Sequence, residues 1–314
     1  MTISTPSQRC RKAFEQERMN DEQGLLSGGP VQTEAHETGW DRFRKNKGAV
    51  IGLVIIAVMM MIALLAPVLA PYSPYETFGD GISAVGAPAA PGPKFLLGCD
   101  NLGRDVLSRL VYASRISLEV GLISAAVSVA LGTLLGVMAA FWGSWVDVLI
   151  MRCTDAMLAF PFLLFVILVV SVLKPSVTII FVVIGLLGWA RAARVARGQT
   201  LSIMQNNFID AARTAGASHW RIIFHHVIPN ILGPLIVLST LQVGNFILTE
   251  GALSYIGAGV PPPVPSWGSM IYTGQQYYQT APWLMLYPGL MMTLTVIGFN
   301  LVGDGLDAAL NPRS

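Results

Sequence analysis

The sequence predicts an all-α membrane protein with six transmembrane helices and both termini in the cytoplasm. The first observation is composition: of the 314 residues, 53% are hydrophobic and only 12% are charged, whereas charged residues approach a quarter of an ordinary soluble domain. The second is the presence of six apolar stretches near the length of about 20 residues that a bilayer core requires. These stretches are residues 48–69, 116–142, 148–173, 177–193, 231–257 and 284–303. Because unpaired backbone groups cannot face lipid, such stretches form helices.

The third observation is the distribution of basic residues. Eight of the twenty Lys and Arg residues precede Gly48, and five more lie at the end of the fourth span or between it and the fifth. Loops rich in Lys and Arg stay on the cytoplasmic side of a membrane. The N-terminus and the C-terminus are therefore expected in the cytoplasm, which agrees with an even number of spans.

The chain before the first span is predicted to consist of two parts. Residues 1–40 are polar and of mixed charge, which indicates a disordered cytoplasmic tail, and they lack the pattern of a cleavable signal peptide. Residues 41–95 are expected to form an N-terminal interfacial helix, the first transmembrane helix and an external loop. Trp40 and Phe43, set among basic residues, favour the short helix in the membrane interface.

Residues 96–312 are predicted to form a five-helix core. A structured external shoulder becomes helical at Arg104 and runs into the second span, with Asp100 and Asp105 placed to pair or to cap the helix. Gly132 and Gly136 have the GxxxG spacing that permits close approach of helices.

The third and last spans add two further expectations. Arg152 and Asp155 lie one turn apart in the third span and can form an ion pair. Four prolines at positions 261, 262, 263 and 265 must separate the last two spans by an external loop. Aromatic residues of that loop are expected in the interfacial belt; they are Trp267, Tyr272, Tyr277, Tyr278 and Trp283.

A polar loop, residues 197–229, interrupts the membrane-seeking part of the chain. Residues 207–215 favour a short helix, Gly216 permits a reversal through positive φ, and Ser218 can cap a second short helix. Two helices joined at a glycine make a rigid projection. Small side chains such as Ala211 and Ala212 would let it enter a groove of a soluble partner, although an amphipathic loop lying on the membrane is the alternative.

Span five carries a polar stripe. Ser239, Gln242, Asn245 and Thr249 recur at steps of three or four residues and so share one helix face. Polar groups within spans face partners or water-filled cavities. The stripe therefore lines a translocation path or forms hydrogen bonds between subunits. Glu250, near the outer end of the span, is expected to contact an external protein or to anchor the outer loop.

Several chemistries are not supported by any motif. The sequence has no GxxxxGK[ST] phosphate loop, so the chain is not expected to bind ATP itself. It has no HExxH or GxSxG pattern, and its three cysteines have no metal-ligand spacing. No cofactor, metal or nucleic acid is expected on this chain, and no enzymatic activity. His219, His225 and His226 are interpreted as ordinary interfacial residues.

The polar loop resembles the EAA signature of ABC-importer permeases: Asp210-Ala211-Ala212, three residues, Gly216, twelve residues and Pro229. Three other stretches resemble the C-type permease of oligopeptide/dipeptide/nickel importers. They are residues 97–110 (LGCDNLGRDVLSRL), residues 250–271 and residues 288–312. The likeness runs from about Asp41 to Pro312. Asp210 stands where the family usually has Glu, and Cys99 where it usually has Thr.

The resemblance implies the type I permease fold of ABC importers, located in the cell inner membrane. It implies a heterodimer with a homologous B-type permease, two ATPase subunits that bind ATP and Mg, and an external solute-binding protein. The residues implied to couple to the ATPases are Asp210, Ala211, Ala212, Arg213, Gly216 and Ala217. The implied solutes are di- or oligopeptides, with glutathione, nickel chelates or sugars as alternatives.

A secondary transporter is the first rival from another class, followed by a membrane enzyme and an ABC exporter. A secondary transporter would need a membrane-buried Asp, Glu or His, or a helix broken at mid-depth. The sequence predicts neither, because its ionisable groups are expected near the ends of the spans.

Overall fold

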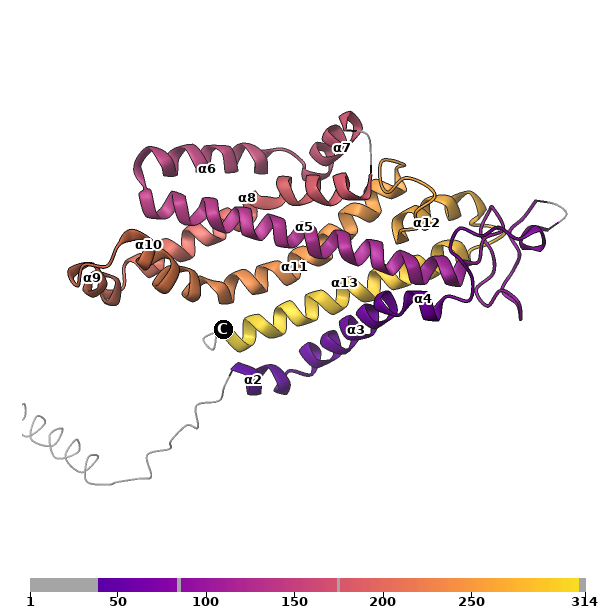
Figure 1. The fold of residues 1–314 in the computed structure, drawn as a ribbon, viewed down its shortest axis with the longest axis horizontal. Coiled ribbons are helices and arrows are strands. Elements are labelled where there is room, and N and C mark those ends of the chain that lie inside the picture. Colours follow the sequence, from indigo (N-terminus) through magenta and orange to yellow (C-terminus); the bar gives the residue numbers. More distant parts are fainter. Residues whose placement is uncertain (1–38, 84–85, 174–175, 311–314) are drawn as a thin grey trace, which may run out of the picture. The chain divides into compact units, whose positions relative to one another are not determined.

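The computed structural model describes residues 39–83, 86–173 and 176–310, and these residues contain helices and isolated bridges but no strand. The predicted tail before Gly39 lies outside the described residues. From Arg42 onward the described chain belongs to one compact unit. The long helices are α3 (Lys47–Leu64), α5 (Val106–Trp142), α8 (Val177–Met204), α11 (Ile228–Tyr255) and α13 (Trp283–Leu310), shown in Figure 1. The shorter helices are α2 (Gly39–Lys45), α4 (Ala66–Leu69), α6 (Ser144–Ala159), α7 (Phe162–Val172), α9 (Asn207–Thr214), α10 (His219–Ile222) and α12 (Trp267–Gly274). Single turns or π segments are η1 (Gly79–Gly81), η2 (Ile223–Val227) and η3 (Gln275–Tyr277).

Five helical segments of the described chain are long and apolar enough to cross a membrane, and they contain α3, α5, α8, α11 and α13. The α6–α7 pair adds a sixth only if the two helices count as one span, because they meet at 92°. The stretch predicted as the third span, residues 148–173, is therefore a bent pair of helices and not one continuous helix. Pro161 cannot continue a helix and drives the preceding residue to extended backbone, and Phe160 has φ −85° and ψ 140°.

Helix α8 is longer than predicted, since it continues past residue 193 to Met204. Ion pairs with α6 accompany the extension. Arg197 donates to Asp147 from Nε at 2.5 Å and from a terminal nitrogen at 2.6 Å, and Arg194 donates to Asp155 at 2.8 Å. The predicted Arg152–Asp155 pair is wrong, because Asp155 turns to the neighbouring helix instead.

Helices α5 and α8 lie side by side at very short range. A Cβ added at Gly132 would lie 2.5 Å from Ala192 Cβ, and one added at Gly136 would lie 2.3 Å from the Ala193 carbonyl oxygen. Only glycine allows this approach. The predicted role of the GxxxG pair in helix contact is confirmed, and α8 is the helix that it contacts.

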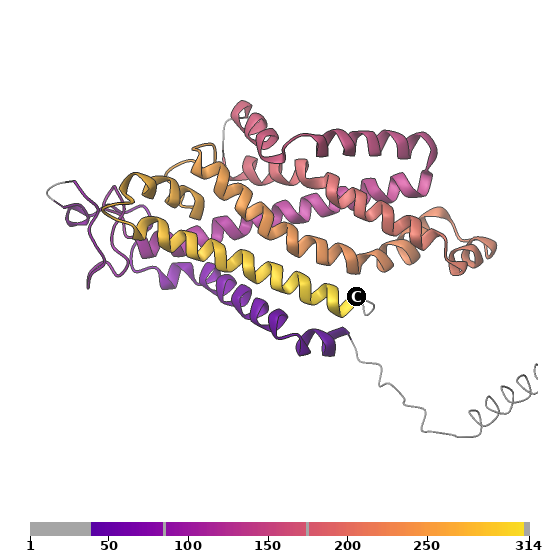
Figure 2. The same ribbon diagram turned by 180° about the vertical axis from the view of Figure 1, so that it is seen from behind.

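A second close pair is formed by α3 and α13, which run beside each other in Figures 1 and 2. A Cβ at Gly52 would meet the Gly298 carbonyl oxygen at 2.7 Å. Further along, Phe43 of α2 packs in a small apolar cluster with Ala49 and Val302. The short helix predicted around Phe43 is present as α2.

The outer loop differs from its prediction. Instead of lying on a surface, α12 packs among α5, α11 and α13. Trp267 is fully buried, and its backbone N–H donates to Ser117 Oγ at 3.2 Å. Its predicted place in the interfacial belt is therefore wrong, whereas Tyr278 is 61% exposed. Ser266 begins the helix with a reciprocal capping box to Ser269.

Candidate coupling loop and translocation cavity

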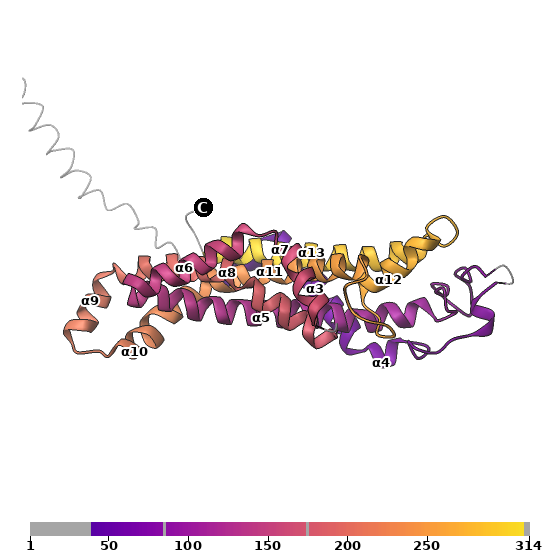
Figure 3. The same cartoon turned by 90° about the horizontal axis from the view of Figure 1, so that it is seen from above.

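The polar loop forms two short helices, α9 and α10, at the end of the bundle where α5 and α8 finish and α11 begins (Figures 1 and 3). Gly216 has φ +79°, and the Ala217 N–H donates to the Ala212 carbonyl at 3.0 Å. This is the glycine-terminated helix end that the sequence predicts. Ser218 then caps α10 by accepting from the Arg221 N–H at 3.4 Å.

Apolar contacts fix the loop to the bundle. Ile209 of α9 and Ile222 of α10 are fully buried. They share one cluster with Val137 of α5 and Ala196 of α8. A loop anchored at both helices in this way moves with the membrane helices rather than independently of them.

The other face of the loop is free of such contacts. Asp210, Ala211, Arg213 and Gly216 are exposed, while Ala212 and Ala217 are half-buried. Arg213 lies 3.4 Å from Asp210, an exposed ion pair of the kind that contributes little to stability. The loop thus presents a small-residue surface with one local charge pair.

The polar stripe of α11 is divided between two cavities. Gln242, Asn245 and Thr249 line one cavity of about 510 Å³. Ser239 instead lines an apolar groove of about 720 Å³, between α5, α11 and the segment around Trp220. The structure therefore brings three of the four predicted residues together and separates the fourth.

The 510 Å³ cavity lies where four elements meet: the end of α6, the start of α7, α8 and α11. Phe160 and Pro161 at the α6–α7 break line it, together with Phe246. Arg191 of α8 also lines it. The sequence interpretation missed Arg191 because it counted the residue with the basic residues of the following loop, although its fourth span, 177–193, includes it.

The side-chain amide of Gln242 has a hydrogen-bonded oxygen and a nitrogen without a partner. Its Oε1 accepts from Ser128 Oγ of α5 at 2.8 Å. Its Nε2 is buried without a hydrogen-bond partner in the described chain, although the residue is only 4% exposed. Asn245 and Thr249 donate to carbonyls of their own helix, at 3.1 and 2.8 Å. The hydrogen bond of Gln242 to Ser128 is thus made within this chain.

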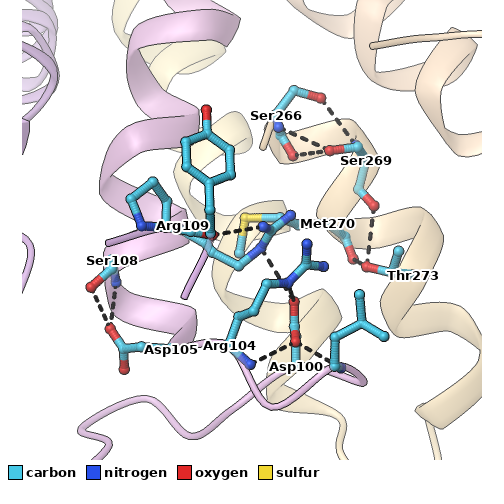
Figure 4. Close-up of polar contacts among 12 residues, drawn as sticks. Asp100, Arg104, Asp105, Ser108, Arg109, Ser266, Ser269, Met270 and Thr273 are labelled. Atoms are coloured by element: carbon cyan, nitrogen blue, oxygen red, sulfur yellow. Dashed lines mark hydrogen bonds and ion pairs between the residues drawn. The ribbon is translucent and has the colours of Figure 1, made fainter. Parts of the chain in front are cut away.

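At the opposite end of α5 lies a buried charge cluster (Figure 4). Asp100 Oδ2 accepts from Arg104 Nε at 2.7 Å and lies 3.3 Å from Arg109 Nε. Arg109 also donates to the Pro74 carbonyl at 3.0 Å. Asp105 caps α5 by accepting from the Ser108 N–H at 2.7 Å. Pairing and capping by the two aspartates, both predicted, are confirmed.

The same end holds the fully buried Glu250. Its Oε1 accepts from Ser254 Oγ at 2.7 Å and from Ser266 Oγ at 2.8 Å. Because Ser266 begins α12, these bonds tie the outer loop to α11. Of the two predicted roles for Glu250, the anchoring one is confirmed.

Two further groups lie near this end. Cys99 is fully buried, and burial raises the pKa of its thiol to about 12. On the surface, Lys94 donates to Asp80, and this bond lowers the pKa of the Asp80 carboxyl.

Taken together, these features define a multi-pass membrane protein with a cavity lined by several polar side chains and an anchored loop at one end. Residues 132–314 match the family described as the binding-protein-dependent transport system inner membrane component. Residues 37–87 match the N-terminal TM domain of oligopeptide transport permease C.

Curated relatives extend this match over most of the chain. The dipeptide transport system permease protein DppC of Alkalihalophilus pseudofirmus is 40% identical over 87% of this chain and 88% of its own. The di/tripeptide permease DppC of Pseudomonas aeruginosa is 40% identical over 87% and 91%. The oligopeptide permease OppC of Bacillus subtilis is 37% identical over 87% and 88%. The chain belongs to the family of inner membrane components of binding-protein-dependent transport systems, and is a multi-pass inner-membrane protein.

Proposed function

We propose that this chain is the C-type permease subunit of an ATP-driven peptide importer. The observation that carries the proposal is the likeness of 87% of the chain to permeases named for dipeptides, di/tripeptides and oligopeptides. Six spans with both termini in the cytoplasm belong to the proposal, as does the division into a tail (1–40), an N-terminal part (41–95) and a permease core (96–312).

In this proposal the chain pairs with a B-type permease, and two ATPase subunits and an external binding protein complete the importer. ATP and Mg are bound by the ATPases, and this chain performs no catalysis. The ATPases grip Asp210, Ala211, Arg213 and Gly216, whose exposure supports the assignment. Ala212 and Ala217, half-buried beneath them, hold the turn.

The anchoring of the loop supports a mechanical coupling. Ile209 and Ile222 are buried in one cluster with residues of α8 and α11, so a displacement of the loop is transmitted to two helices that line the 510 Å³ cavity. ATP-driven closure of the ATPases would move both loops of the heterodimer and reorient the cavity. The translocation path is proposed to be lined by Gln242, Asn245 and Thr249. Ser239 lines the separate apolar groove, so it would belong to the path only beyond the 510 Å³ cavity.

A secondary transporter remains the rival class. The sequence-based grounds against it do not hold, since α6 and α7 form a broken pair and Glu250 is fully buried within α11. Family membership, rather than the positions of charged groups, favours the ATP-driven mechanism.

The test is peptide import into proteoliposomes containing the complete importer, with and without ATP on the ATPase side. ATP-dependent uptake supports the proposal, and equal uptake without ATP would reject it in favour of a secondary transporter. Capture assays on the external binding protein would decide between peptides and glutathione, nickel chelates or sugars.

One variant tests the coupling loop. Gly216→Pro should abolish stimulation of ATP hydrolysis by loaded binding protein, because proline fixes φ near −65° whereas Gly216 has φ +79°. Gly216→Ala is the matched control. Its Cβ would meet no atom within 4 Å, and the left-handed conformation costs about 1–2 kcal/mol, so stimulation should largely persist. Full stimulation in Gly216→Pro would contradict the coupling role.

A further inference from the structure

Arg191 occupies an unusual position for a charged side chain. It lies halfway along α8, the 28-residue helix Val177–Met204, which is long and apolar enough to span a membrane. Charged residues within membrane-spanning helices are costly and mark ligand or ion pathways when they face a cavity. Arg191 lines the 510 Å³ cavity.

The neighbouring arginines of α8 have partners, and Arg191 does not. Arg194 and Arg197 form ion pairs with the two aspartates of α6. Arg191 lies one turn before Arg194. The part of the cavity wall that α6 contributes holds Leu158 in place of an acidic residue. Among the described residues no hydrogen bond or ion pair to Arg191 is present. Its positive charge is thus available to a molecule within the cavity.

A second unpaired donor belongs to a residue that lines the same cavity. Gln242 lies halfway along α11 (Ile228–Tyr255) and lines the cavity, with its Nε2 buried and without a partner. A buried donor left without an acceptor costs stability, so an acceptor that reached Gln242 Nε2 from the cavity would be favoured. The remaining wall is largely apolar, with Phe160, Phe162 and Phe246 among its residues.

We propose that Arg191 and Gln242 form a carboxylate-binding subsite for the transported peptide. This inference rests on the proposed function and adds the group of the solute that is recognised. The planar guanidinium matches a carboxylate geometrically, Gln242 Nε2 donates to a peptide carbonyl or to the carboxylate, and the aromatic wall receives apolar side chains. The cavity volume falls within the range of about 300–1,000 Å³ typical of small-ligand sites.

The break between α6 and α7 is consistent with this location. Discontinuous helices near mid-depth form the solute sites of many transporters, and here Phe160 and Pro161 at the break line the cavity. The two donors therefore stand on unbroken helices, α8 and α11, while the broken pair closes the opposite wall. A solute held by Arg191 would touch all four elements.

The experiment uses the complete importer in proteoliposomes with ATP. It compares import of the dipeptide Ala-Phe with import of its C-terminal amide, each at a concentration that saturates the binding protein. Because the binding protein is saturated with either peptide, its own preference between them does not affect the comparison. Wild type should import the free acid faster than the amide. Arg191→Gln should lower import of the acid by about ten- to a hundredfold, the effect expected for losing a charged hydrogen bond, with little change for the amide.

Two further variants separate recognition from structure. Arg191→Lys keeps the charge but loses the planar pair of donors of the guanidinium, so its preference for the acid over the amide should be intermediate. If the importer with Arg191→Gln does not assemble, the same comparison of acid and amide is made with Arg191→Lys. Arg194→Gln removes one positive charge from the next turn of α8, outside the cavity residues, and should keep the wild-type preference.

An unchanged ratio of acid to amide in both Arg191 variants would overturn the proposal. So would an equal loss of both peptides, which would assign Arg191 to an ion pair with the partner permease. Absence of ATP-dependent import of either peptide by the wild-type complex is a separate result, because it rejects the proposed function itself.

Discussion

Replacing Gly136 with alanine should separate the two most closely packed helices of the bundle. The added Cβ would lie 2.3 Å from the Ala193 carbonyl oxygen and 2.8 Å from Ala196 Cβ. Both distances are below the ordinary contact range, which begins near 3.4 Å. Because the nearer atom is helix backbone, a side-chain rotation cannot relieve the overlap, so α5 and α8 must move apart.

The magnitude follows from a matched pair of substitutions. Overpacking of this kind costs about 1–3 kcal/mol, but replacing glycine in a helix with alanine also gains about 1 kcal/mol of helix propensity. Gly198 on α8 provides the control, since a Cβ there would meet no atom within 4 Å. The propensity gain is common to both variants, so the difference between Gly136→Ala and Gly198→Ala isolates the steric cost of about 1–3 kcal/mol.

The assay is SDS-induced unfolding of the permease complex purified in mild detergent, followed by tryptophan fluorescence. Gly198→Ala should unfold at the same or a higher SDS fraction than wild type, and Gly136→Ala at a lower one. Equal midpoints for the two variants would refute the packing argument. They would mean that the close α5–α8 approach does not contribute to stability.

Two further predictions concern the N-terminal end of α5. Asp100→Asn should destabilise the complex by about 3–5 kcal/mol, because it leaves two buried guanidinium groups without their counter-charge; Asp80→Asn, on an exposed carboxyl, should change the same unfolding midpoint little. In a Cys10→Ser, Cys153→Ser background, Cys99 should resist N-ethylmaleimide at pH 8 until the protein unfolds, because its thiol is buried and its pKa is raised to about 12. Since the unfolded thiol ionises first, the Cys99 contribution to stability should be lost as pH rises from about 9; rapid labelling of the folded protein would contradict the burial.

The polar loop, residues 197–229, shows what local sequence can specify. Gly216 at positive φ and Ser218 as a helix cap are decided by residues within one or two turns of each other, so both were predictable. Asp105 as the cap of α5 belongs to the same group. These features depend on backbone geometry and short-range hydrogen bonds, which a few consecutive residues determine.

The cavity shows the opposite case. The stripe of Gln242, Asn245 and Thr249 was visible from helical spacing, but Ser239 shares that spacing and lines a different groove. Arg191 was assigned to a loop, since nothing in its neighbourhood indicates how far α8 extends. The pairing of Asp155 with Arg194 likewise depends on the crossing of α6 and α8, and not on spacing within one helix.

The sequence by itself determined that the chain forms apolar helices, where a glycine reverses the coupling loop, and the family that its motifs resemble. These follow from hydropathy, backbone preference and residue order. Only the tertiary structure decided that the third span breaks at Phe160–Pro161, that Trp267 is buried, and that two donors from α8 and α11 line one cavity. The reason is physical: burial and pairing depend on which helix faces come together, and that is settled by packing between segments distant in the chain.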